Sequence, residues 1–212
     1  MKTNVITAIL LSLFALAAPT FGQTNATDLA TLNERVAKLE KQVADMSRML
    51  GPFQAQQAVD ARRTALREKF NSRNADDRKK YTPDQLAEAE QLYQVANQKW
   101  GTPEAAASLQ AMIKKFPDIN RTGCAVLYVA QMSKGEERAQ HLRDCVEKFG
   151  NCMYGDGVQV GTYARYLLMF DSRGSGDTEK ADSLANELKT AFPEAVDHGG
   201  NLLVENLKKD SK

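Results

Sequence analysis

Apolar residues recur at alternating intervals of three and four along residues 29–53, with mostly polar residues between them. This spacing holds across three heptads and predicts a helix with a coiled-coil seam. Valine at a with leucine at d favours a dimer, whereas methionine and phenylalanine at the later d positions leave a trimer open. The other interpretation is a helix that docks on the chain's own globular part. The seam consists of Leu29, Val36, Val43 and Leu50 at a, and Leu32, Leu39, Met46 and Phe53 at d.

The pattern changes at Gly51-Pro52, where a kink or a break in the helix is expected. Residues 54–80 permit a helix and are basic: from Arg62 to Lys80 eight cations stand against three carboxylates, a net charge of +5. A solvated connector helix is the first interpretation. An acidic partner or an anionic surface polymer is the alternative.

Helix start and stop signals alternate with apolar stripes of helical spacing from Thr82 onward. Thr82, Pro83 and Gln85 form a capping box, and Ser133 with Glu136 forms a second. No segment alternates with a period of two, so the predicted fold class is all-α. Three helix pairs are expected, with helices that end before Gly101, Pro117, Ser133, Gly150, the 172–177 turn and Pro193.

The three pairs end on similar corners. Phe116, Phe149 and Phe192 each stand directly before Pro117, Gly150 or Pro193, at separations of 33 and 43 residues. Ala105 and Ala181 each precede their proline by twelve residues, whereas the middle pair has Arg138 and Gly150 at these places. A small residue allows close helix packing, and a terminal proline cannot continue the helix. The spacing indicates a repeat with one insertion.

This repeat resembles the tetratricopeptide repeat (TPR), whose 34-residue unit has small residues near these positions and a terminal proline. The resemblance covers residues 82–198 and is carried by Gly-Thr-Pro-Glu-Ala at 101–105 and Gly-Asp-Thr-Glu-Lys-Ala at 176–181. The first-helix signature is poorly kept, and the middle unit lacks the alanine and the proline. The resemblance implies a TPR-like α-solenoid of about three helical hairpins, whose first helices line a concave surface that binds proteins.

The first 22 residues have the order of a secretory signal peptide. One early cation, Lys2, precedes an apolar run that Pro19 breaks before small residues. Cleavage after Gly22 is expected, with an exported, periplasmic or secreted product and no stable membrane insertion. A signal peptide, a coiled coil and such repeats in this order are similar to the plan of the Tol-Pal-associated periplasmic cell-division coordinators, which implies an envelope adaptor.

The charges of the whole chain nearly balance, with 28 Lys and Arg against 27 Asp and Glu, which gives no case for nucleic acid. Three cysteines are too few for a disulfide-built scaffold. A bond between Cys124 and Cys152 is favoured over one between Cys124 and Cys145, because Cys145 also falls in the packed stripe of its helix. We expect no metal site and no cofactor.

Residues 154–161, YGDGVQVG, are the most distinctive stretch outside the repeat. The first interpretation is a turn between two packed units, with Asp156 as a cap of the following helix. The second is a partner-binding loop made of Tyr154, Asp156, Gln159, Tyr163 and Arg165. His198 lies in DHGGN, which is interpreted as a helix end with a glycine cap.

These observations predict a non-enzymatic exported adaptor, with no catalytic residues, that self-associates and binds protein partners. The expected segments are the signal peptide (1–22), the coiled coil (23–53), the basic connector (54–81) and the repeat domain (82–212). The alternative is an envelope hydrolase or glycan-binding module that uses the 154–165 loop.

Overall fold

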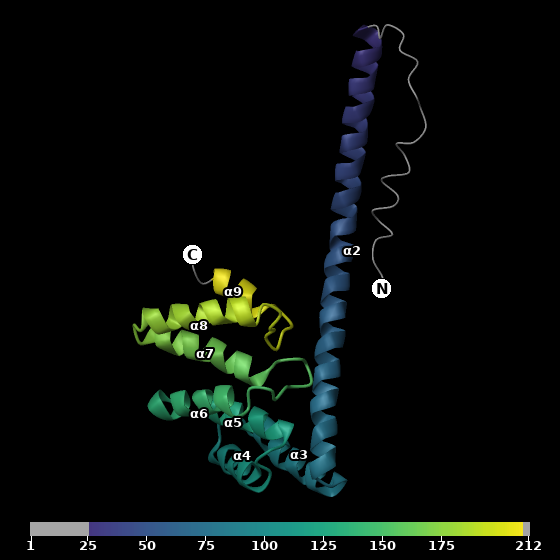
Figure 1. The fold of residues 1–212 in the computed structure, drawn as a ribbon. Coiled ribbons are helices and arrows are strands. Elements are labelled where there is room, and N and C mark those ends of the chain that lie inside the picture. Colours follow the sequence, from purple (N-terminus) through teal and green to yellow (C-terminus); the bar gives the residue numbers. More distant parts are fainter. Residues whose placement is uncertain (1–25, 210–212) are drawn as a thin grey trace. The chain divides into compact units, whose positions relative to one another are not determined.

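A computed structural model describes residues 26–209 of the 212-residue chain. The regular elements in this range are α-helices, joined by turns and two isolated β-bridges, so the predicted all-α class is confirmed (Figure 1). The predicted signal peptide, residues 1–22, lies outside the described residues, as do residues 23–25 and the last three residues of the chain.

Helix α2 (Ala26–Lys80) contains Pro52 and continues through it. Of the two alternatives expected at Gly51-Pro52, a kink or a break, the break is therefore wrong. A proline inside a helix removes one backbone hydrogen bond, at a cost of about 3 kcal/mol, and the helix-favouring residues on both sides here outweigh it. The chain still divides into two compact units close to this point, Met1–Ala55 and Gln56–Lys212.

The coiled-coil seam of the first unit is exposed. Each of its eight a and d side chains leaves 49–70% of its surface accessible. None of the described residues 28–54 is classed as buried, so this stretch of α2 contributes no core of its own. No helix among the described residues is long and apolar enough to cross a membrane.

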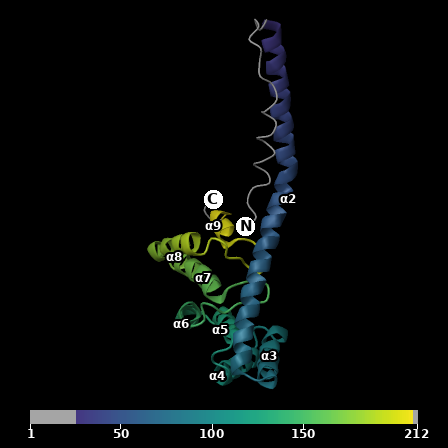
Figure 2. The ribbon, with the colours of Figure 1, turned by 45° about the vertical axis from the view of Figure 1, so that its right-hand side comes forward.

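The described part of the second unit contains seven further helices, each packed against the next along the chain (Figures 1 and 2). Thr82 caps the first of them through the predicted capping box, and the side chains of Thr102 and Asp177 cap two others. The box predicted at Ser133 is wrong, because that residue is already the end of one helix and Lys134 begins the next. The helices are α3 (Pro83–Gln98), α4 (Pro103–Lys115), α5 (Asn120–Met132), α6 (Gly135–Glu147), α7 (Val160–Gly174), α8 (Thr178–Ala191) and α9 (Leu203–Lys209).

The two small residues expected to allow close helix packing in the repeat, Ala105 and Ala181, lie in the core. Ala105 and Ala181 are buried where their helices approach neighbours. At the matching place in the middle pair, Arg138 donates to the Asp171 carboxylate over 2.7 Å and to the Ala130 carbonyl over 3.3 Å. A guanidinium that bonds two other helices replaces close packing there, which explains why the middle pair tolerates a large residue.

Residues 56–80 of α2, which we call the spine, lie across the connections between the helix pairs. Successive spine residues meet the α8–α9, α6–α7 and α4–α5 connections in that order, so the spine runs antiparallel to the order of the pairs. One face of the spine is therefore packed, while most of its residues are exposed to solvent. The contacts are Arg62 with Glu194 (2.8 Å), Leu66 with Gly157, Phe70 with Gly155, Arg73 with the Asp118 carbonyl (2.7 Å), and Asp77 with Asn120 N–H (2.7 Å).

A buried polar cluster holds the end of the spine. Asp77 leaves only 5% of its surface accessible, and its carboxylate accepts hydrogen bonds from Arg73 and from the backbone of Asn120. The Asn120 side chain in turn donates to the Met153 carbonyl and accepts from the Met153 N–H, each over 2.7 Å. Because buried polar groups are stable only when they are paired, this network selects one position for the spine on α5 and on the α6–α7 connection.

Candidate functional site

Two loops of the second unit have the same backbone structure. They span residues 152–160 and 195–203, and we call them the twin loops. Each closes with an antiparallel bridge, Met153 with Gln159 and Val196 with Leu202, and each turns at a glycine with positive φ, Gly157 or Gly200. Five backbone hydrogen bonds in and around the loops recur with an offset of 43 residues, including Val160 N–H to the Cys152 carbonyl and Leu203 N–H to the Ala195 carbonyl, both 2.8 Å.

The twin loops bring a carboxylate and an imidazole together. His198 Nδ1 lies 2.8 Å from Asp156 Oδ2, although the two residues are 42 positions apart. The imidazole also makes edge contacts with the rings of Tyr154 and Tyr163, at centroid distances of 4.8 and 5.2 Å. Asp156 and His198 are both partly exposed, so a solute can reach them.

A cavity of about 310 Å³ opens beside this pair. The spine supplies Arg63, Leu66 and Arg67, and the twin loops supply the pair itself and four glycines. Glycines leave the backbone accessible, while the two arginines stand one helical turn apart and add positive charge. The glycines are Gly155, Gly157, Gly199 and Gly200.

The carboxylates of the twin loops are stabilised in their charged form. Burial alone would raise the pKa of Asp156, but hydrogen bonds from His198 and from the Val158 N–H outweigh it and hold the pKa below its usual value. Asp197 behaves in the same way, because hydrogen bonds from Asn201, Asn206 and the Gly199 N–H outweigh its burial. Both side chains therefore stay anionic at neutral pH.

The five residues predicted to form a binding loop lie in two places. Tyr154, Asp156 and Tyr163 meet at His198, as described above. Gln159 and Arg165 instead line a different cavity, on the side of Phe192. Gln159 donates to the Gly150 carbonyl over 2.9 Å, and Arg165 pairs with Glu187 over 2.7 Å and stacks on the Phe192 ring.

Asp156 does not cap the following helix. Its carboxylate accepts from the Val158 N–H inside the loop, and Gln159 occupies the N-cap position of α7 without a side-chain cap bond. The helix end proposed for DHGGN is also wrong, because α8 ends at Ala191 and residues 197–201 form the second twin loop. There the Asp197 side chain, rather than a glycine cap, organises the turn.

Sequence reasoning gave His198 no part in a binding site, and it counted Arg63 and Arg67 only within the basic stretch for which an acidic partner was the alternative interpretation. One signal was present: YGDG and DHGG lie 43 residues apart, the same offset as Phe149 and Phe192. Equal offsets place the two stretches at equivalent corners of neighbouring helix pairs, where they can touch. The positive charge of the arginines was visible in the sequence, but their place at the cavity was not, because it depends on how the spine packs.

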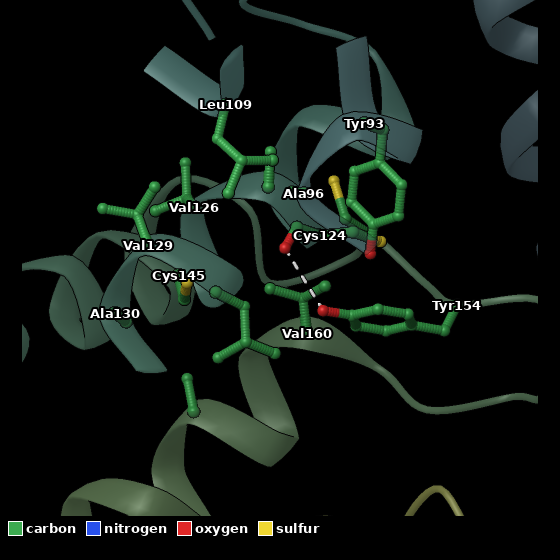
Figure 3. Packing of buried hydrophobic residues seen from close by; sticks show 14 of the residues in the cluster. Tyr93, Ala96, Leu109, Cys124, Val126, Val129, Ala130, Cys145, Tyr154 and Val160 are labelled. Carbon is green, nitrogen blue, oxygen red and sulfur yellow. Dashed lines mark hydrogen bonds between the residues drawn. The ribbon is translucent and has the colours of Figure 1, made fainter. Parts of the chain in front are cut away.

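The three cysteines are buried free thiols in the structure. Burial raises the pKa of Cys124, Cys145 and Cys152, so none is a ready nucleophile. Figure 3 shows Cys124 and Cys145 among the core side chains, with the Tyr154 hydroxyl donating to the Cys124 carbonyl over 3.2 Å. Cys152 packs against Gly123, next to Cys124 in the chain. The bond between Cys124 and Cys152 stays a prediction.

The chemistry available at the twin loops is proton exchange and anion binding. A carboxylate that orients an imidazole is the arrangement of a general base. Among the residues that line the cavity there is no Ser, Thr or Cys. Nor does any group of three or more His, Cys, Asp or Glu in the described part of the chain have the arrangement of a metal site. Comparison of the chain with protein-family models, with curated proteins and with solved structures found no match.

Proposed function

We propose that this protein is a non-enzymatic, exported adaptor of the cell envelope that self-associates through residues 29–53 and binds partner proteins on a TPR-like repeat surface. The observation that carries the proposal is the exposed seam of α2, eight apolar side chains in unbroken heptad register with about half or more of their surface accessible. An apolar stripe of this length on a water-soluble helix requires a cover.

The heptad register of the seam favours a second copy of the same helix as the partner that buries it. In a coiled coil each seam side chain inserts between four residues of the facing helix, and burial contributes roughly 25 cal/mol per Å² of apolar surface. A lone helix of this composition gains little from propensity. Self-association therefore stabilises this helix, because it buries the apolar seam that stays exposed in a single chain.

The helix pairs of the second unit support the binding part of the proposal. The pairs α3–α4, α5–α6 and α7–α8 follow one another with matching corners, as hairpins of a solenoid do. Aromatic rings at successive contacts of 4.8–6.1 Å connect the α3–α4 turn with α7, and all but Tyr154 are at least partly exposed. Aromatic side chains are enriched where proteins bind one another. The chain of rings is Trp100, Tyr128, Tyr154, His198, Tyr163, Tyr166 and Phe170.

The test of self-association is sedimentation of the wild type against Leu32→Asp/Leu39→Asp. We expect the wild type to be a dimer or trimer at micromolar concentration and the variant a monomer, because two carboxylates cannot be buried in the seam. The matched control is Lys41→Ala/Arg48→Ala, which lowers the net charge by the same two units on the outer helix face and should sediment as the wild type. A wild type that is monomeric at about 100 µM, or a variant that sediments with it, contradicts the proposal.

A second candidate is an envelope hydrolase or glycan-binding module at the 154–165 loop. The pair of Asp156 and His198 beside an open cavity favours it, since this pair can act as a general base. Its test is turnover or binding of soluble cell-wall fragments by the wild type and by Asp156→Asn. Activity that the substitution abolishes supports the second candidate, and no turnover or binding with either protein contradicts it.

A further inference from the structure

The two flanks of the spine differ in how their cations are paired. On one flank Arg62 pairs with Glu194, and Arg73 pairs with Asp77 and with the Asp118 carbonyl. On the other flank Arg67 and Arg78 have no ion-pair partner among the described residues. Arg63 there has only Asp60, at 3.7 Å, with both side chains more than half exposed. An exposed pair of this kind contributes at most about 1 kcal/mol, so it does not neutralise the flank.

The free cations share one stripe of the helix. Positions 63, 67, 70, 74 and 78 follow each other at intervals of three or four, which places their side chains in one row. The row begins with Arg63 and Arg67, continues through Phe70 and Asn74, and ends with Arg78. From Arg63 to Arg78 the helix rises about 22 Å.

Two cavities lie along this row. The first is the cavity of about 310 Å³ at the twin loops, lined by Arg63 and Arg67. The second has about 190 Å³ and is lined by Phe70, Asn74 and Arg78 of the spine and by residues of α3 and α5. Gly155 of the first cavity lies beside the Phe70 ring of the second, so the cavities adjoin. We call the two together the spine groove.

The carboxylates that face the spine groove are already satisfied. Asp156 is held by His198 and by the Val158 N–H. Asp77 accepts from Arg73 and from Asn120. Glu90 accepts from Arg121 over 2.7 Å and from Gln94 over 2.6 Å. The groove therefore has anions that are already paired and three exposed cations, of which Arg63 has only a weak partner and Arg67 and Arg78 have none among the described residues.

We propose that the spine groove binds an extended acidic peptide segment of a partner protein, with one carboxylate on Arg63 and Arg67 and another on Arg78. Charge complementarity favours this occupant, because guanidinium groups pair with carboxylates through strong, oriented hydrogen bonds. The length agrees, since about 22 Å corresponds to about seven residues of extended chain. The inference rests on the proposed function: it names the class of partner and the surface that the adaptor uses.

The test uses the full-length protein and a fluorescein-labelled serine–alanine peptide of about eight residues with glutamates at both ends, followed by fluorescence anisotropy. The comparison peptide has glutamine in place of each glutamate. We expect binding of the glutamate peptide at least about tenfold tighter than that of the glutamine peptide. Arg63→Gln/Arg67→Gln should weaken it by about tenfold, and Arg78→Gln by about threefold.

The matched control is Lys69→Gln/Lys80→Gln, which removes the same charge from exposed spine positions that line neither cavity. It should change the affinity by less than about twofold. Equal losses in the control and in Arg63→Gln/Arg67→Gln, or equal binding of the two peptides, overturns the inference. Such a result leaves self-association intact in sedimentation, so it separates failure of the groove from failure of the adaptor proposal.

Discussion

At the scale of single residues, Asn120 is the clearest example of a side chain whose role is structural. Its position in an Asn-x-Ser/Thr sequence would make it a glycosylation acceptor on a surface loop. In the folded chain only 3% of the Asn120 surface is accessible. The side-chain amide nitrogen donates to the Met153 carbonyl, and the amide oxygen accepts from the Met153 N–H. The folded protein therefore does not offer this amide for modification.

Asn120→Ala should destabilise the second unit by about 2–4 kcal/mol, because it leaves the buried Met153 N–H without a partner and leaves the Met153 carbonyl only the weak thiol donor of Cys124. Urea denaturation followed by circular dichroism measures the change. Asn97→Ala is the control, since Asn97 is exposed and bonds only Gln94. A loss within about 0.5 kcal/mol of the control would show that the network is dispensable.

The lowered pKa of Asp197 predicts that the stability of the folded protein depends on pH. The Asp197 pKa in the folded state lies below its usual value, so the anionic form stabilises the fold above the unfolded pKa, near about 4. This contribution is lost as pH falls through the lower, folded pKa. The melting temperature of Asp197→Asn should lie below that of the wild type at pH about 7, and the gap should narrow as the pH falls below about 4.

The control for this pH series is Asp182→Asn, which changes an exposed carboxylate on α8. It should follow the wild type at each pH. A constant gap between Asp197→Asn and the wild type down to pH about 3 would mean that the loss comes from packing and not from the charge of Asp197.

At the scale of elements, the close approach of α7 to the preceding corner depends on one glycine. A Cβ at Gly161 would come within 2.5 Å of Gly150 Cα, a backbone atom that cannot move aside. At Gly174, in the last turn of the same helix, nothing lies within 4 Å. The two glycines therefore form a matched pair for testing whether close packing or helix propensity dominates.

Gly161→Ala should destabilise the protein by about 1–3 kcal/mol through this overlap. Gly174→Ala should leave stability unchanged or raise it by up to about 1 kcal/mol, because alanine favours the helix more than glycine does. Chemical denaturation of both variants measures the difference. If Gly161→Ala is as stable as Gly174→Ala, the contact between α7 and the corner is looser than described.

At the scale of the whole molecule, self-association and the spine groove together predict avidity. An oligomer presents several grooves, so on a dense layer of the acidic peptide a second contact forms at a high effective concentration. The wild type should dissociate from such a layer at least about tenfold more slowly than Leu32→Asp/Leu39→Asp. On a sparse layer the two should dissociate alike, as surface plasmon resonance can measure.

Lys41→Ala/Arg48→Ala again serves as the control and should behave as the wild type on both layers. Equal dissociation of the wild type and the seam variant on the dense layer would mean that the oligomer does not present its grooves to one surface. That outcome would limit the coiled coil to a role in stability.

Local signals determined the helices of this protein and their order. The Thr82 capping box, the corners at Pro117 and Pro193 and the heptads of residues 29–53 each act over one or two helical turns, so they can be read from short stretches. The continuity of α2 through Pro52 could not be read from a short stretch, because one proline sets a local energetic cost that the rest of a long helix outweighs.

The candidate site was decided by tertiary structure. Asp156 and His198 meet because equivalent corners of two helix pairs stack, and Arg63 and Arg67 reach them because the spine crosses those corners. These contacts join residues 42 to more than 90 positions apart. The sequence alone thus determined an all-helical chain with an apolar seam and repeated corners, while only packing over long separations decided which side chains share a cavity.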